Sequence, residues 1–80
     1  MHVAVEISLY PLSDGYIPPI KDFIGRVAAR PGLRVVTNSM STQVSGDLAV
    51  VMPALQEEMA VTFGRSHRSV FVMKVLGGGG

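Results

Sequence analysis

The decapeptide NSMSTQVSGD, residues 38–47, gathers hydrogen-bonding side chains within a chain that is otherwise rich in valine, leucine, isoleucine and methionine. Its polar members are Asn38, Ser39, Ser41, Thr42, Gln43, Ser45 and Asp47. Their hydroxyl, amide and carboxylate groups can donate and accept hydrogen bonds, so the segment could form one wall of a binding site. The same residue types also favour turns and exposed strand faces, so an ordinary turn between two strands is an equal alternative.

A second set of polar residues lies on the first predicted strand, residues 2–10. This strand alternates, with Val3, Val5, Ile7 and Leu9 on one face and Glu6, Ser8 and Tyr10 on the other. On the strand predicted at 41–45, Ser41, Gln43 and Ser45 also share a face. If the two strands are neighbours, these residues form a polar strip on an apolar sheet surface. Such a strip needs hydrogen-bond partners when it is covered, and an uncharged heterocycle with several donors and acceptors would suit it.

Four further elements must position these strands. Residues 20–30 carry a helical apolar stripe of Ile20, Phe23, Ile24, Val27 and Ala28, in which we expect Gly25 to mark close packing on the sheet. Residues 33–38 pair with 41–45 as a hairpin. A second helix spans 47–63, with Asp47 as N-cap, Gly64 as its stop, and an apolar face of Leu48, Val51, Met52, Leu55, Met59 and Phe63. Residues 67–76 form a last strand that is apolar on both faces.

The order β-α-β-β-α-β predicts an α+β domain of the ferredoxin-like type, with a four-stranded antiparallel sheet and two helices on one face. The other face of the sheet is then bare, although a strand that is apolar on both sides is normally covered on both sides. We therefore expect a homodimer or homotetramer that assembles through the open sheet face. Residues 1–76 are expected to form the single domain, and residues 77–80 a flexible glycine tail.

Composition excludes several classes of protein. Seven Lys and Arg residues against six Asp and Glu residues give a net charge of +1, and no basic run occurs, so the signature of a nucleic-acid binder is missing. No apolar run approaches the roughly 20 residues that span a bilayer, and no signal peptide is visible. The lack of cysteine fits a reducing compartment. We expect a cytoplasmic protein with no nucleic-acid or membrane partner.

Metal-binding and catalytic patterns are weak. His2 and His67 have no metal-ligand spacing and no cysteine is available, so no metal site is predicted. Ser41, His67 and Asp47 could be combined into a catalytic triad, but the GxSxG elbow that would support it is missing. The glycines form neither a GxxxxGK nor a GxGxxG phosphate-binding loop. No cofactor is predicted.

Two segments carry a family resemblance: ISLYPLSDGYI, residues 7–17, and STQVSGD, residues 41–47. Together they resemble the YkoF-related family of thiamine- and hydroxymethylpyrimidine-binding proteins. The resemblance runs from Val3 to Val75 and includes His67 at the start of the last strand. It implies ferredoxin-like modules that pair sheet to sheet and bind the pyrimidine part of thiamine without catalysis, in transport or salvage of the vitamin.

The resemblance also implies a set of ligand-binding residues, to which strand geometry adds three more. The resemblance contributes Ser8, Tyr10, Ser41, Thr42 and Asp47, and the strand geometry contributes Glu6, Asn38 and Gln43. Tyr10, Tyr16 or Phe71 could stack on the ring. The chain departs from the family in two respects: it holds one module where tandem members hold two, and it ends in KVLGGGG where they have a CPG-like segment.

Three functions follow as hypotheses. The favoured one is a non-catalytic binding protein for thiamine or its hydroxymethylpyrimidine moiety, with the ligand on the polar strip near a dimer interface. The second is a dimeric enzyme with cofactor-free acid/base chemistry, in which Glu6 or His67 is the general base and burial raises the pKa of the glutamate. The third is a structural module whose apolar sheet face only assembles copies.

Overall fold

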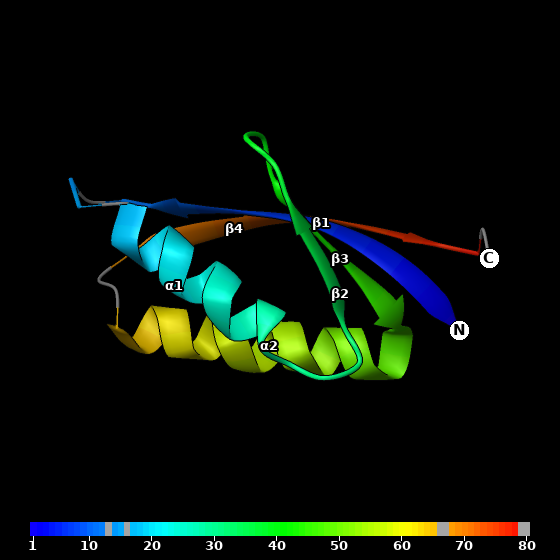
Figure 1. Cartoon of the computed structure of the whole chain (residues 1–80). Helices are drawn as coiled ribbons and strands as arrows, with labels where there is room; N and C mark the ends of the chain where they lie inside the picture. Colours follow the sequence, from blue (N-terminus) through cyan, green and yellow to red (C-terminus); the bar gives the residue numbers. More distant parts are fainter. Residues whose placement is uncertain (13, 16, 66–67, 79–80) are drawn as a thin grey trace.

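The computed structural model describes residues 1–12, 14–15, 17–65 and 68–78. Its elements are β1 (His2–Pro11), α1 (Ile17–Ala28), β2 (Arg34–Thr37), β3 (Thr42–Asp47), α2 (Leu48–Arg65) and β4 (Ser69–Gly77). The four strands form one sheet in the order β2-β3-β1-β4, and all neighbouring strands are antiparallel. Both helices cover the same face of this sheet (Figure 1). The ferredoxin-like α+β fold is therefore confirmed.

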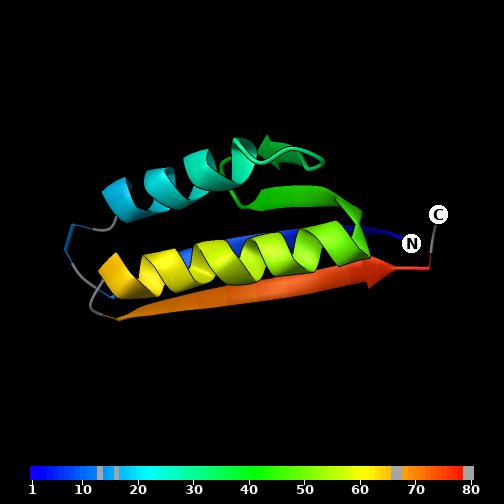
Figure 2. The same ribbon diagram turned by 90° about the horizontal axis from the view of Figure 1, so that it is seen from below.

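The core lies between the sheet and the two helices, which run side by side beneath it (Figure 2). The inward face of β1 contributes Val3, Val5, Ile7 and Leu9, all buried, as the alternation predicted. Val44 of β3 and the helix residues Phe23, Val27, Val51 and Leu55 complete the buried cluster. Because β1 is a central strand that buries every second side chain, the polar residues between them must lie on the open face.

Several predictions about single residues are wrong. Gly25 does not pack on the sheet, because it is exposed and a methyl group placed there would meet no atom within 4 Å. Gly64 does not end the second helix, which continues to Arg65. Phe63 is 53% exposed, and the buried positions of α2 include Glu58 and Thr62. The predicted glycine tail begins too early, since β4 includes Gly77.

A network of charged side chains joins the two helices. Arg26 of α1 donates to the Glu58 carboxylate at 2.6 Å, to the Glu58 carbonyl at 3.0 Å and to the Thr62 hydroxyl at 2.7 Å. Arg30 donates to the other carboxylate oxygen of Glu58 at 2.7 Å and also pairs with Glu57. Glu58 is only 8% exposed, so these bonds replace the water that its charge would otherwise require. The network fixes the position of α1 relative to α2.

We expect Glu58→Gln to destabilise the domain by about 2 kcal/mol at neutral pH, because the neutral amide loses the charge-assisted bonds from Arg26 and Arg30, which keep their pairs with Asp22 and Glu57. Burial raises the pKa of Glu58, but the hydrogen bonds from Arg30 and Arg26 outweigh it and the pKa is lowered from 4.5. A lowered pKa stabilises the fold above pH 4.5 and this contribution is lost as the pH falls below it. Urea unfolding between pH 7 and pH 3 measures both effects.

Glu57→Gln is the matched control for this prediction, since Glu57 is the neighbouring carboxylate on the same helix but is exposed. Exposed ion pairs contribute about 0–1 kcal/mol. Equal losses of stability in the two variants, or no steeper acid destabilisation in wild type than in Glu58→Gln, would contradict the role given to Glu58.

Candidate functional site

The candidate site lies beyond the Ile7↔Thr42 pair, where β1 continues but β3 no longer pairs with it. β3 pairs with β1 from His2↔Asp47 to Ile7↔Thr42, whereas β4 pairs with β1 as far as Pro11↔Ser69. Residues 8–11 of β1 therefore have a strand neighbour on one side only. On the other side, the tip of the β2–β3 hairpin leaves the plane of the sheet, away from the helices (Figure 1).

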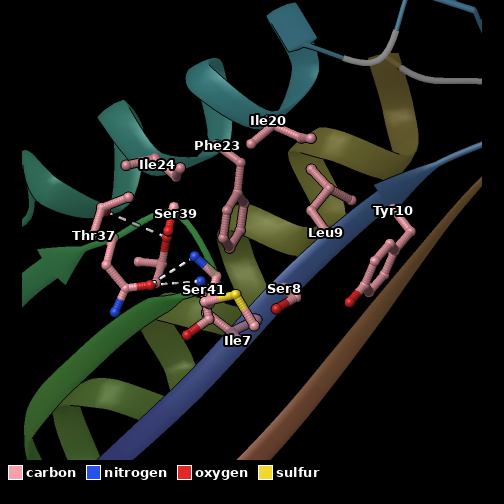
Figure 3. Close-up of a pocket in the computed structure, with 13 residues that line it drawn as sticks. Ile7, Ser8, Leu9, Tyr10, Ile20, Phe23, Ile24, Thr37, Ser39 and Ser41 are labelled. Atoms are coloured by element: carbon pink, nitrogen blue, oxygen red, sulfur yellow. Dashed lines mark hydrogen bonds between the residues drawn. The ribbon is translucent and has the colours of Figure 1, made fainter.

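This departure opens a hollow of about 190 Å³ between β1, α1 and the hairpin tip (Figure 3). Its apolar lining comes from β1 and α1: Ile7, Leu9, Ile20, Phe23 and Ile24. Its polar lining comes from β1 and the hairpin: Ser8, Tyr10, Thr37, Asn38, Ser39, Ser41 and Thr42, with Met40 beside them. An apolar floor with a few convergent polar groups is the usual composition of a small-molecule site.

The hairpin tip is held by its own hydrogen bonds. Asn38 Oδ1 accepts the backbone N–H groups of Met40 at 2.7 Å and Ser41 at 3.0 Å, and the Asn38 N–H donates to the Ser41 carbonyl at 3.1 Å. An asparagine that bonds to backbone two residues ahead is a common turn former. The structural work of Asn38 thus uses its side-chain oxygen and leaves its amide N–H₂ available to a ligand.

Thr42 points into the molecule and not onto the open face. It is opposite Ile7 in the β1–β3 register, so its side chain lies on the helix side, where it is 4% exposed. Its hydroxyl lies 3.3 Å from the Thr37 hydroxyl. Thr42 therefore lies outside the predicted polar strip, whose member Gln43 is on the opposite face of the strand, across from Glu6.

Two further hollows lie on the open sheet face. One, of about 250 Å³, adjoins the hairpin and is lined by Glu6, Ser8, Tyr10, Met40, Ser41, Val72 and Lys74. The other, of about 510 Å³, is lined by Ala4, Val5, Glu6, Gln43, Lys74, Val75 and Leu76. Glu6 Oε1 lies 3.9 Å from Lys74 Nζ between them. Ser8, Tyr10, Met40 and Ser41 line both the first of these and the hollow between β1, α1 and the hairpin, called below the hollow over Phe23, so the two hollows adjoin at these residues.

The structure brings five of the eight predicted site residues together around the hollow over Phe23: Ser8, Tyr10, Asn38, Ser41 and Thr42. Glu6 lies in the adjoining open-face hollow, and Gln43 lies opposite it in the strand register. Asp47 is not brought to the site. It is opposite His2, five residue pairs and about 17 Å along the sheet from Thr42.

Asp47 instead caps α2, as the sequence predicted. Its carboxylate accepts the Ala49 N–H at 3.1 Å and the N-terminal ammonium of Met1 at 2.8 Å. The ammonium group and then the Ala49 N–H lower the pKa of Asp47 below its ordinary value. These contacts account for the carboxylate without any ligand.

The aromatic residue of the hollow is one that sequence reasoning did not select. Phe23 was predicted only as part of the core stripe of a helix, yet its ring lines the hollow (Figure 3). Phe71 packs behind it on the helix side, with ring centroids 4.8 Å apart, so it does not face the hollow. Tyr16 and His67 lie outside the described residues. The position of Phe23 next to Ile20 and Ile24 on one helical stripe carried no signal that would separate a site residue from a core residue.

No metal site or membrane-crossing helix is found in the described ranges. Among these residues, no group of three or more His, Asp or Glu side chains could hold a metal ion. Within the same ranges, every helix is too short or too polar to cross a membrane.

The model of the YkoF-related family matches residues 2–73, nearly the whole described fold. The chain belongs to the YkoF-related family. No curated protein matches this family member closely.

Solved structures match this YkoF-related chain over 95–100% of its length. The hypothetical protein MJ1052 of Methanocaldococcus jannaschii superposes with a TM-score of 0.75 at 26% identity, covering 95% of this chain and 79% of that one. Protein SP2199 of Streptococcus pneumoniae gives a TM-score of 0.78 at 20% identity, over 98% and 88% of the two chains. A candidate thiamine biosynthesis/salvage protein of Thermotoga maritima, TM0486, gives 0.76 at 19% identity, over 100% and 88%.

We expect Asp47→Ala to lower the melting temperature while leaving the hairpin unchanged, because the residue caps α2 at the far end of the sheet. Thermal unfolding and ¹H–¹⁵N spectra measure the two effects. Asp47→Asn, which keeps a capping oxygen, is the matched control and should recover most of the loss. Chemical-shift changes at Ser39 or Ser41 in Asp47→Ala would contradict the separation of Asp47 from the site.

Proposed function

We propose that this chain is a non-catalytic binding protein for thiamine or its hydroxymethylpyrimidine moiety, acting in transport or salvage of the vitamin. The observation that carries the proposal is a hollow of ring size in which an aromatic floor meets a polar rim. Phe23 supplies the floor, and Ser8, Asn38 and Ser41 supply the rim. The name of the Thermotoga maritima protein points to the same class of ligand for a relative of the same fold.

An aminopyrimidine matches both parts of this hollow. Its face is flat and can pack against the half-buried side chains of Ile20 and Ile24, beside the edge of the Phe23 ring, which is 2% exposed. Its edge carries ring-nitrogen acceptors and an amino donor, which hydroxyl and amide groups can complement. Hydroxymethylpyrimidine has about ten heavy atoms, so at roughly 0.5–0.8 kcal/mol per atom its dissociation constant falls between millimolar and micromolar. Thiamine is larger and its thiazolium can extend toward the open face.

The geometry favours binding over catalysis at this hollow. Glu6, the general base of the enzymatic alternative, does not line the hollow over Phe23 and lies 3.9 Å from the Lys74 ammonium. The groups that do line it are hydroxyls, amides and apolar side chains. These can orient a heterocycle but are poor proton acceptors at neutral pH.

We expect thiamine and hydroxymethylpyrimidine to bind saturably to protein that has been unfolded and refolded to remove carried-over ligand. Isothermal titration calorimetry should show that Ser41→Ala weakens binding about 2- to 10-fold, because one rim hydrogen bond is lost. Ser45→Ala is the matched control, since Ser45 lies on β3 opposite Ala4, away from the hollow. Asp47→Ala should also keep its affinity. Absence of heat and of thermal stabilisation at millimolar ligand would refute the proposed function.

A second copy of the chain on the open sheet face is part of this proposal. β4 exposes Val70, Val72 and Leu76 on that face, and Met40 of the hairpin is 84% exposed beside them. A long edge strand with exposed apolar side chains is rarely left uncovered. Ser8, Tyr10, Met40 and Ser41 line both the hollow over Phe23 and the neighbouring hollow on the open face. A partner copy that covers the open face would therefore lie next to the ligand.

Val72→Glu should therefore convert a dimer into a monomer in sedimentation velocity at micromolar concentration, because it places a charge in the covered face. Val50→Glu is the matched control: Val50 is similarly exposed, at 44% against 50%, but lies on α2 on the other side of the molecule. A wild-type monomer, or identical assembly of both variants, would contradict pairing through the open face.

A further inference from the structure

Hydrogen bonds at the two ends of β1 show which of its residues bond to β4 and which to β3; this alternation is called the hydrogen-bond phase below. The Leu12 N–H donates to the Arg68 carbonyl at 2.9 Å, one step beyond the Pro11↔Ser69 pair. In an antiparallel pair, residues that exchange hydrogen bonds alternate with residues that do not. Tyr10, Ser8 and Glu6 therefore direct their backbone N–H and C=O groups to β4.

The intervening residues of β1 direct theirs to β3. The bond from the Leu48 N–H to the Met1 carbonyl, at 2.8 Å and one step beyond the His2↔Asp47 pair, has this phase and confirms it. Val3, Val5 and Ile7 thus bond to β3, and Ile7 is the last to find a strand partner, Thr42. The next residue in this series is Leu9.

Leu9 has no strand opposite it. By the register, Met40 of the hairpin tip would be the residue opposite Leu9. The Met40 and Ser41 N–H groups instead donate to the Asn38 side chain, and the Asn38 N–H donates to the Ser41 carbonyl. Within the described ranges, no backbone hydrogen bond reaches the N–H or C=O of Leu9 from that side. Leu9 also lines the hollow over Phe23 (Figure 3), and the alternation places its donor and acceptor on the side of β1 where the hairpin tip borders that hollow. Buried main-chain groups are almost always paired, which makes a ligand the natural partner.

We infer that the main-chain N–H and C=O of Leu9 select a ligand that carries a ring-nitrogen acceptor next to an exocyclic amino donor. This inference rests on the proposed function and assigns the atoms that recognise the ligand. In an extended strand, the N–H and C=O of one residue point the same way, side by side. The 4-amino group and the neighbouring ring nitrogen of an aminopyrimidine are the complementary pair.

This arrangement discriminates against the 4-oxo analogue of the same ligand. When the amino group is replaced by oxygen, the neighbouring ring nitrogen carries hydrogen, so donor faces donor and acceptor faces acceptor at Leu9. A site that leaves a buried polar group unpaired rejects the analogue more strongly than one that loses an apolar contact. Side-chain hydroxyls can rotate to donate or accept, but the backbone of Leu9 cannot adapt in this way.

The test replaces the Leu9 amide by an ester in chemically synthesised protein, which removes the N–H and keeps the side chain. An ester at Met73 is the matched control, since the Met73 N–H points to the free edge of β4 by the same phase. Each ester also weakens one carbonyl of the β1–β4 ladder, that of Ser8 or that of Val72, so this side effect is equal in the two proteins. Without ligand, the two esters should melt at the same temperature.

Calorimetric titration of thiamine should give a 5- to 10-fold weaker affinity for the Leu9 ester than for the Met73 ester, the loss expected from one hydrogen bond of about 1 kcal/mol. In wild type, oxythiamine, the 4-oxo analogue, should bind at least about 30-fold more weakly than thiamine, whereas pyrithiamine, which keeps the aminopyrimidine, should not.

Equal affinities of the two esters for thiamine, or equal affinities of thiamine and oxythiamine, would overturn this inference and leave the proposed function standing. A Leu9 ester that melts well below the Met73 ester would overturn the hydrogen-bond phase itself. No binding of thiamine or pyrithiamine to wild type would refute both proposals.

Discussion

The unequal lengths of two neighbouring strands determine the rest of the site. β1 continues to Pro11, but β3 begins opposite Ile7, so the sheet loses one strand where β1 still runs. A sheet that stops in this way exposes backbone donors and acceptors that would otherwise be paired. The Asn38 turn prevents the hairpin from filling the gap, because it bonds the tip to itself. The hollow over Phe23 is the consequence.

The helices give this gap its floor. α1 places Phe23 under the end of β1, and Phe71 supports the ring from behind at 4.8 Å. α1 is in turn fixed to α2 by the Arg26–Glu58 and Arg30–Glu58 pairs, and the Arg26 guanidinium lies 5.9 Å from the centroid of the Phe23 ring. A small domain has few buried side chains with which to hold a helix, so this buried network replaces apolar packing that the chain lacks. The stability of the network and the shape of the site are therefore linked through α1.

The sequence was sufficient to predict the fold and part of the site. The two-residue period of β1 and the order of elements led to the sheet topology, and this topology brought Ser8 and Tyr10 to the hairpin residues Asn38 and Ser41. The strand alternation also placed Gln43 correctly on the open face, opposite Glu6. Thr42 came from the family resemblance, and it lines the hollow from the helix side because successive residues of a strand point to opposite faces.

Other features required three-dimensional geometry. Phe23 looks like any core residue on a helical stripe, and the pairing of Glu58 with Arg26 joins residues 32 positions apart. Asp47 belongs to a motif that the family resemblance carried into the site, yet its carboxylate is committed to the start of α2. The break in the β1–β3 ladder at Leu9 involves only backbone atoms, so no side-chain pattern could indicate it.

The most direct test of the account is the position of the bound pyrimidine. Isotope-filtered nuclear Overhauser measurements on labelled protein with unlabelled thiamine would report which side chains lie next to the 2-methyl group. The account predicts contacts to the Phe23 ring, Ile24 and Ser41, which line the hollow between α1 and the hairpin. Contacts to Val72 and Lys74 without any to Phe23 would place the ligand on the open sheet face and contradict it.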